Sequence, residues 1–300
     1  MKIAITTASG HVGSAVADFL LDLGGDIRVR LLGRRPEKLT RFVRRGAEMT
    51  IGAQDNVDYL VRATQDVDAI FWVTPPGYGS DNVRAFQNRL AKAAATTLRI
   101  NRVPRVVNLS SIGAELEAGA GPISGLHDVE GLLDGACGNT THLRPGFFFE
   151  NLLWQLDSIR KSGTISLPIS GSQRYPMIAT RDIGRVAAER LADGSWTGQS
   201  VAELHGPADL SFDETAEVLS QALGRKIRYV QCDRQKMRQA IIENGVSENA
   251  ADAMLEMYDA VESGKLRPAQ PRSRQTTTPT TFSEFARSVM LPLLTETVTH

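Results

Sequence analysis

Short runs of β-branched residues alternate with longer helical patterns along the first half of this chain, and this alternation constrains the fold more than any other feature. The expected strands are residues 3–6, 27–32, 48–51, 69–74, 105–109 and 140–144. Helical patterns separate them, most clearly over residues 12–23 and 83–98. Such alternation is typical of a parallel sheet whose right-handed crossovers place helices on both faces. We therefore predict a doubly wound α/β sheet over residues 1–150, completed by about residues 177–205.

The second half is less regular and predicts a smaller, mainly helical lobe over the carboxyl ends of the strands. We assign residues 151–176 and 206–300 to this lobe. Residues 151–160 have a helical pattern, and residues 235–264 have the pattern of two helices. The Gly, Ser, Pro and Thr content predicts a loop over residues 168–176 and an extended surface segment over residues 267–280.

Three sequence signals mark helix starts in this half. Thr180 is predicted to cap a helix that runs to about residue 192. Ser211 with Glu214, and Thr281 with Glu284, have the spacing of capping boxes.

Charge and cysteine content exclude several classes of protein. The chain has 34 basic and 34 acidic residues, whereas a protein that wraps nucleic acid normally has a basic excess. Two cysteines cannot build a disulfide framework and fit a reducing compartment. No apolar run is long enough to span a bilayer, and the first residues do not resemble a signal peptide. We expect a soluble cytoplasmic protein that binds neither nucleic acid nor membrane.

A glycine loop lies where the first strand meets the first helix. Free N–H groups at a helix start favour an anion such as a pyrophosphate, and the loop residues expected at this site are Thr7, Ser9, Gly10, His11, Val12 and Gly13. Gly10 permits close backbone approach and Gly13 permits close packing of the helix on the sheet. The usual three-glycine pattern is incomplete, because its first glycine falls on Thr7. The alternative is a simple tight turn.

Basic residues follow the second strand, at the position where NAD-preferring proteins carry an acid. Arg34, Arg35 and Lys38 stand there, and a guanidinium can bind a phosphate with two hydrogen bonds. Eight basic and two acidic residues lie between Asp26 and Arg45, so a positive segment is hidden in the neutral total. We therefore predict NADP(H) in preference to NAD(H). The alternative is a solvated basic helix face.

The sequence resembles the NmrA-like branch of the atypical short-chain dehydrogenases. The residues that carry the resemblance are 8–13, 34–38, 107–111, 125–130, 142–152 and 176–183. The resemblance spans essentially the whole chain, and its most specific segment is the run from His142 to Leu152. It implies a Rossmann domain that binds NADP(H), with a small C-terminal lobe.

Carried across by residue, the resemblance implies that Thr74 and Ser110 line the ribose and nicotinamide. It also implies that residues 147–149, beginning with Phe147, lie near the nicotinamide and the substrate entrance. The sequence departs from the family at Thr7, and at Ala53, where relatives often have an aspartate near the adenine.

The tyrosine–lysine pair of typical short-chain dehydrogenases is absent. The residues four positions after the five tyrosines are Ala63, Asn82, Ala179, Asp233 and Glu262. The remaining candidates are His127 as a proton donor, because imidazole titrates near neutral pH, and Ser110 with Ser111 as hydrogen-bonding groups. Each has a structural alternative: His127 as a helix packing residue and the serines as strand-end caps. Glu130 either orients His127 or, as we favour, pairs with a basic group.

The remaining polar and aromatic candidates divide between structure and binding. His142 is expected to be structural, and the histidines and cysteines are too dispersed to indicate a metal site. Residues 147–149 and Trp154 form either an apolar floor for a flat substrate or core between the two parts of the chain.

Three functional hypotheses follow. The leading one is an NADPH-dependent reductase of a flat conjugated small molecule, quinone-like or enone-like, because such an acceptor needs little help from a protein acid. The alternative is a non-catalytic NADP(H)-binding sensor that regulates a partner protein, and the third is a non-redox biosynthetic enzyme. A homodimer is compatible with each.

Overall fold

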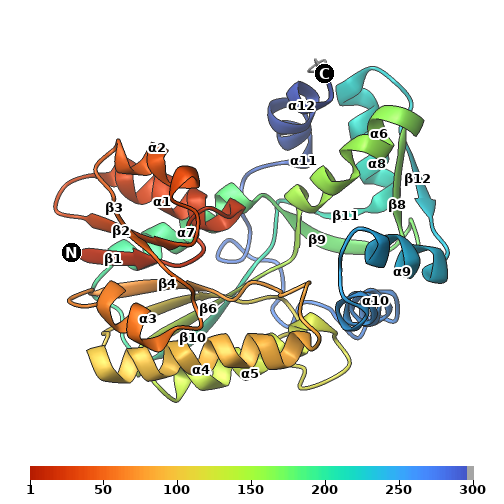
Figure 1. The fold of residues 1–300 in the computed structure, drawn as a ribbon. Helices are drawn as coiled ribbons and strands as arrows, with labels where there is room; N and C mark the ends of the chain where they lie inside the picture. The colour runs from red at the N-terminus through yellow and green to blue at the C-terminus, as the bar shows by residue number, and fades with distance from the viewer. Residues whose placement is uncertain (296–300) are drawn as a thin grey trace.

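The computed structural model describes residues 1–295, and its larger part is a seven-stranded sheet whose strands all run parallel (Figure 1). The strand order is β10-β6-β5-β4-β1-β2-β3. The strands are β1 (Lys2–Ile5), β2 (Arg28–Gly33), β3 (Glu48–Ile51), β4 (Ala69–Val73), β5 (Val106–Leu109), β6 (Thr140–Pro145) and β10 (Gln199–Leu204). The order reverses direction at β1, so the carboxyl ends of β1 and β4 border the crevice in which such sheets bind ligands.

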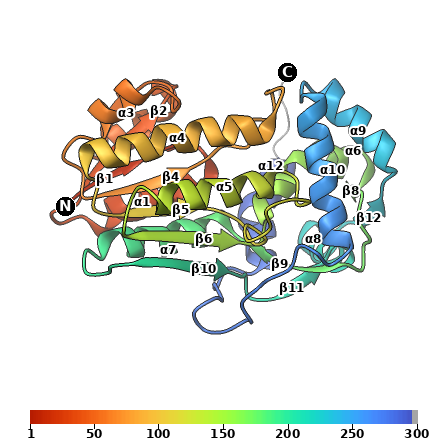
Figure 2. The ribbon, with the colours of Figure 1, turned by 90° about the horizontal axis from the view of Figure 1, so that it is seen from below.

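Helices cover both faces of this sheet, as Figures 1 and 2 show. One layer contains α1 (His11–Leu23), the short η1 (Pro36–Lys38) and α2 (Thr40–Val43), and α7 (Thr180–Ala192). The other contains α3 (Val57–Ala63), α4 (Val83–Asn101) and α5 (Pro122–Asp134). Side chains alternate along β1, where Ile3 and Ile5 pack in the core beneath α1 and Ala4 packs in the opposite core. This alternation fixes which layer each helix joins.

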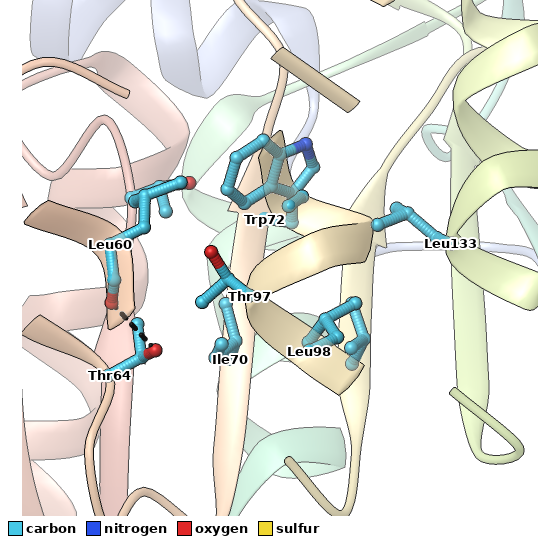
Figure 3. A pocket seen from close by; sticks show the side chains of 10 residues that line it. Leu60, Thr64, Ile70, Trp72, Thr97, Leu98 and Leu133 are labelled. Carbon is cyan, nitrogen blue, oxygen red and sulfur yellow. Dashed lines mark hydrogen bonds between the residues drawn. The ribbon is translucent and has the colours of Figure 1, made fainter. Parts of the chain in front are cut away.

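A small apolar cavity lies between β4 and the helices α3, α4 and α5 (Figure 3). Its volume is about 10 Å³, which is room for no more than one water molecule. Leu60, Trp72 and Leu98 line it, together with Thr97, whose hydroxyl makes no hydrogen bond. The cavity is therefore a packing feature of the core and is too small for a ligand.

The smaller part of the molecule packs its helices against two short sheets. The helices are η2 (Phe149–Gln155), α6 (Leu156–Ser162), α8 (Phe212–Leu223), α9 (Arg234–Glu243), α10 (Glu248–Glu262), α11 (Phe282–Phe285), the π-helical η3 (Ala286–Met290) and α12 (Leu291–Thr295). The strands are β7 (Phe147–Phe148), β9 (Arg174–Ile178) and β11 (Asp209–Ser211) in one sheet, and β8 (Thr164–Leu167) and β12 (Arg228–Gln231) in the other. Phe149 is fully buried against the rings of Phe282 and Phe285, which closes the core of this lobe.

The predicted α/β sheet with a helical C-terminal region is confirmed, and each predicted strand matches an observed one to within one residue at either end. Both capping boxes are confirmed, at Ser211 and Thr281. Thr180 is not a helix cap. Ala179 precedes the helix, and the Thr180 hydroxyl instead donates 2.6 Å to Glu150.

Two predicted irregular segments are wrong in part. Residues 174–176 belong to β9, which pairs with β11 and β7 on its two sides. Most of residues 267–275 are exposed, as predicted, but residues 276–280 pack beside the end of β10 instead of lying on the surface. There the backbone of Thr278 donates 2.9 Å to the His205 carbonyl, and the side chains of Thr276 and Thr278 are buried. Threonine hydroxyls satisfy these buried polar positions, which a composition rule cannot anticipate.

Among residues 1–295, no helix combines the length and the apolar character that crossing a bilayer requires.

Candidate dinucleotide-binding site

The glycine loop closes tightly on the first turn of α1. Thr7 has a left-handed backbone with φ of +50°, a conformation that glycine adopts at lower cost. The Gly10 N–H donates 2.9 Å to the Thr7 carbonyl. A Cβ added at Gly13 would overlap that same carbonyl oxygen, so only glycine allows the helix to approach the loop. The first turn of α1 has no acidic residue, which leaves its N–H groups and dipole suited to an anion.

Gln54 connects this loop to the neighbouring strands, and sequence reasoning missed it. Its Nε2 donates 2.7 Å to the Val73 carbonyl, and its Oε1 accepts a 3.3 Å hydrogen bond from the Thr7 hydroxyl. Gln54 lies three residues after β3 at the carboxyl edge of the sheet. That position is itself a signal, because ligands of doubly wound sheets bind at this edge.

A cleft of about 330 Å³ opens beside the loop, at the carboxyl ends of β1 to β4. Among the predicted cofactor residues, the structure places Thr7, Ser9, Arg34, Arg35 and Lys38 in its wall. The cleft is also lined by residues that follow β3 and β4 and by residues of α4, among them Gly52, Ala53, Gln54, Asp55, Pro75, Phe86 and Leu90. Gly10, His11, Val12 and Gly13 form the adjoining helix start and do not line this cleft.

The positive segment is divided between structure and cleft. Arg41 and Arg45 pair with Asp18 on α1, at 2.9 and 2.5 Å, and Arg30 pairs with Glu48 at 2.7 Å. Within the described residues, the three cleft-lining cations Arg34, Arg35 and Lys38 form no ion pair. These three side chains supply the positive charge available to an arriving phosphate, and Asp55, which also lines the cleft, is paired with Arg89 at 3.4 Å.

Thr74 and Ser110, both expected near the nicotinamide, end neighbouring strands. The Thr74 hydroxyl accepts 2.8 Å from the Trp72 indole N–H and is nearly buried. The Ser110 hydroxyl donates 2.5 Å to Glu130. Its proton is thus already engaged, so Ser110 offers an incoming group its lone pairs.

Glu130 belongs to a buried ion cluster. The pattern of the sequence does not predict its partners, Arg144 and Ser110. Arg144 donates from two nitrogens to the Glu130 carboxylate, at 2.9 and 2.6 Å, and reaches Glu115 at 2.8 Å. No hydrogen bond joins Glu130 to His127 in the described part of the chain. The favoured structural interpretation of Glu130 is therefore confirmed.

His127 lies on α5 and is partly exposed. Its Nδ1 is 3.0 Å from the Ala114 carbonyl oxygen. A carbonyl only accepts, so Nδ1 carries the proton and Nε2 is left for another partner. The neighbouring Asp128 is held by Arg84 at 2.7 Å and by Asn88, and the Arg84 hydrogen bond keeps the pKa of Asp128 below its usual value.

The other candidates divide as follows. His142 is buried and bridges Asn108 and Asp134, at 3.0 and 2.9 Å, which confirms its structural role. Phe147 packs edge-on against Phe212 with ring centroids 5.5 Å apart. Among the described residues, no group of three or more His, Cys, Asp or Glu side chains is arranged to hold a metal ion.

The parallel sheet in this order, with a glycine loop opening its first helix, defines an α/β protein of the Rossmann class. A family model described as the NmrA-like family matches residues 1–286, and the chain belongs to that family.

Named relatives share nearly the full length of the chain. An NAD(P)H azoreductase of Xenophilus azovorans is 29% identical over 95% of this chain and 97% of its own. The (4-alkanoyl-5-oxo-2,5-dihydrofuran-3-yl)methyl phosphate reductase of Streptomyces griseus is 30% identical over 92% of each chain. The triphenylmethane reductase of Citrobacter sp., solved with NADP(H), has a TM-score of 0.79 at 20% identity and covers 98% of this chain and 100% of its own.

Proposed function

We propose that this chain is an NADPH-dependent reductase of flat, conjugated small molecules. The observation that carries the proposal is the cleft beside the glycine loop, where Arg34, Arg35 and Lys38 line one wall. A wall of this charge fits the 2′-phosphate that distinguishes NADPH from NADH. The adjoining start of α1, with no acidic side chain, fits the pyrophosphate.

The residues present fit the dinucleotide sterically as well as electrostatically. Gly10 and Gly13 keep side chains away from the loop, and a Cβ at Gly10 would lie 3.3 Å from the Thr7 carbonyl. Thr74 and Ser110 directly follow β4 and β5, and we expect them to lie near the ribose and nicotinamide. Bound NADPH would supply the hydride.

The protein groups favour acceptors that need little acid catalysis. No tyrosine of the chain is followed by lysine four residues later, and the Ser110 hydroxyl proton is engaged by Glu130. A conjugated acceptor spreads the charge that it gains with the hydride, so water or His127 Nε2 suffices to deliver the proton. The products are then NADP⁺ and the acceptor with one added hydride and one added proton.

The relatives support this class of substrate. The names of the two sequence relatives describe reduction of an azo compound and of an oxo-dihydrofuran, and the triphenylmethane reductase is described as acting in the bioremediation of triphenylmethane dyes. Each of these compounds contains a conjugated system. We further expect the protein to act in the cytoplasm, where its two free cysteines stay reduced.

The proposal is tested by following NADPH oxidation at 340 nm with a quinone, an enone and an azo dye as acceptors. We expect turnover with at least one class and weaker activity with NADH. If NADPH binds and none of the three acceptors oxidises it above background, the chain is not a reductase of this class.

The second candidate is an NADP(H)-binding sensor that acts on a partner protein. The observation that favours it is the engagement of Ser110 and Glu130 in a buried cluster, which leaves His127 as the one candidate acid. Equal affinities for NADP⁺ and NADPH without turnover, together with a partner whose binding depends on the nucleotide, would select the sensor.

A further inference from the structure

Trp154 differs from the other two tryptophans of the chain in its exposure. Its exposed fraction is 72%, whereas those of Trp72 and Trp196 are 3% and 7%. It lies on η2, directly after the strand β7 that carries Phe147 and Phe148. Phe149 of the same helix is buried in the lobe core, so the position of Trp154 is set by a firmly packed neighbour.

The Tyr78 ring contacts the Trp154 ring. The two rings are 6.1 Å apart between centroids and 81° apart in plane, an edge-to-face contact. Tyr78 belongs to the loop between β4 and α4, whereas Trp154 belongs to the lobe. The pair therefore bridges the two parts of the protein.

The loop that carries Tyr78 is tied down at several points. The Tyr78 carbonyl accepts 2.9 Å from the Ser247 N–H, and the Ser247 hydroxyl donates 2.6 Å to the Ser80 carbonyl. The Val83 N–H donates 2.9 Å to Asn249. Burial raises the pKa of Tyr78. A loop anchored in this way presents the tyrosine ring in a fixed orientation.

The same loop begins at the cofactor cleft. Pro75 lines that cleft, and Tyr78 follows three residues later, so their Cα atoms lie within about 11 Å of each other. This loop therefore joins the wall of the cofactor cleft to the Tyr78–Trp154 ring pair.

We propose that Trp154, held edge-on by Tyr78, is a stacking platform for the second ring of an extended conjugated substrate. This inference rests on the proposed reductase function and narrows its substrate class to molecules with at least two linked rings. A large exposed indole face that already contacts a neighbouring ring can gain an offset stacking contact with a flat ring. The edge-to-face contact with Tyr78 leaves a face of the Trp154 indole open to a substrate ring.

The test measures binding, so it does not depend on turnover. The NADP⁺ complex is titrated by calorimetry with methyl red, an azo dye with two rings, and with duroquinone, which has one. Trp154→Ala is expected to weaken methyl red binding by about three- to tenfold and duroquinone binding by less than about twofold. Trp154→Phe and Tyr78→Phe keep the aromatic faces and are expected to retain most of the affinity. The control is Ile100→Ala, which changes an exposed apolar residue of α4. It is expected to change the affinity for neither dye nor quinone.

Two outcomes overturn the inference. One is an equal loss for both probes in Trp154→Ala, and the other is a methyl red affinity that Trp154→Ala leaves at the wild-type or Ile100→Ala value. The inference is also overturned if the wild-type protein does not bind methyl red. Failure of the reductase function is separate, because it appears as absent NADPH turnover while the dependence of methyl red binding on Trp154 persists.

Discussion

The Thr7 hydroxyl donates a 3.3 Å hydrogen bond to Gln54 Oε1, and this contact joins the glycine loop to the segment after β3. Thr7 occupies the position of the first glycine in the usual dinucleotide loop, and its φ is +50°. The chain thus keeps the left-handed backbone of the glycine loop without the glycine. The single hydroxyl proton of Thr7, which Gln54 Oε1 shares with the Val73 carbonyl at 3.4 Å, offsets part of the conformational cost.

Thr7→Gly is therefore expected to leave the free energy of unfolding within about 1 kcal/mol of wild type. Relief of the left-handed conformation, about 1–2 kcal/mol, opposes the loss of the hydrogen bonds. NADPH affinity should be preserved or increased, as fluorescence titration of bound NADPH will show. Thr7→Ser retains the hydroxyl and serves as the control. A collapse of binding in Thr7→Gly alone would show that the Thr7 side chain contacts the cofactor directly.

Gly13→Ala should be more damaging than Gly10→Ala. A Cβ at Gly13 overlaps the Thr7 carbonyl, which is backbone and cannot move aside, whereas a Cβ at Gly10 stays 3.3 Å from it. We expect Gly13→Ala to lower the free energy of unfolding by about 2–3 kcal/mol in urea melts and to abolish tight NADPH binding. Gly131→Ala, exposed on α5 with open space around it, should be neutral or stabilising. Equal effects at positions 10 and 13 would contradict this account of the loop.

Arg34→Ala should distinguish the two dinucleotides. Removing a guanidinium that binds the 2′-phosphate is expected to weaken NADPH binding by about tenfold or more, with a change of less than about twofold for NADH. Arg44→Ala is the matched control, because Arg44 is exposed in the same basic segment and lies outside the cleft. An equal loss of NADPH and NADH affinity in Arg34→Ala would rule out the 2′-phosphate assignment.

His127→Ala should lower turnover of acceptors that take their proton from His127 rather than from water, without lowering NADPH affinity. If Nε2 delivers the proton, kcat is expected to fall by about a hundredfold for acceptors that need it, and added imidazole should restore part of the rate. The melting temperature should change little, because the side chain makes one hydrogen bond, to the Ala114 carbonyl. If this variant keeps wild-type turnover with every acceptor, His127 is not the proton donor and serves only in packing.

The sequence predicts the sheet well because its evidence is local and periodic. Strands such as Glu48–Ile51 and helices such as Val83–Asn101 follow from short runs of residues. The segment 267–280 escapes prediction, since its threonines are buried by hydrogen bonds to distant residues. Thr280, for example, donates from both its N–H and its hydroxyl to Asp182, at 2.8 Å each.

The candidate site also has features that the sequence predicts and features that it does not. The residues from Thr7 to Gly13, and Arg34 with its neighbours, are contiguous in sequence and directly follow strands, so their location could be predicted. The tie between Thr7 and Gln54, and that between Ser110 and Glu130, each join elements that meet only in the folded sheet. The partners of such residues depend on tertiary packing, which a single sequence does not specify.

Glu203 makes the contact between residues 269–270 and β10 dependent on pH. This buried carboxylate accepts 2.9 Å hydrogen bonds from the N–H groups of Ala269 and Gln270, and its Oε2 lies 3.3 Å from His205 Nε2. Burial alone would raise its pKa, but these hydrogen bonds outweigh burial and hold the pKa below the usual value. The folded protein therefore binds fewer protons here than the unfolded chain. The resulting stabilisation is complete above the ordinary glutamate pKa of about 4.3 and is lost as pH falls through the lower folded value.

Glu203→Gln should remove this dependence. An amide NH₂ in place of one carboxylate oxygen leaves the N–H of Ala269 or Gln270 without an acceptor, so we expect a loss of about 1–3 kcal/mol at pH 7. That loss should shrink between pH 5 and pH 3, because protonation removes the same acceptor from the wild type. Urea melts at several pH values measure the difference, and Glu189→Gln, an exposed carboxylate on α7, is the control. A difference between the Glu203→Gln and wild-type proteins that stays constant over this range would mean that the Glu203 charge does not hold residues 269–270 against β10.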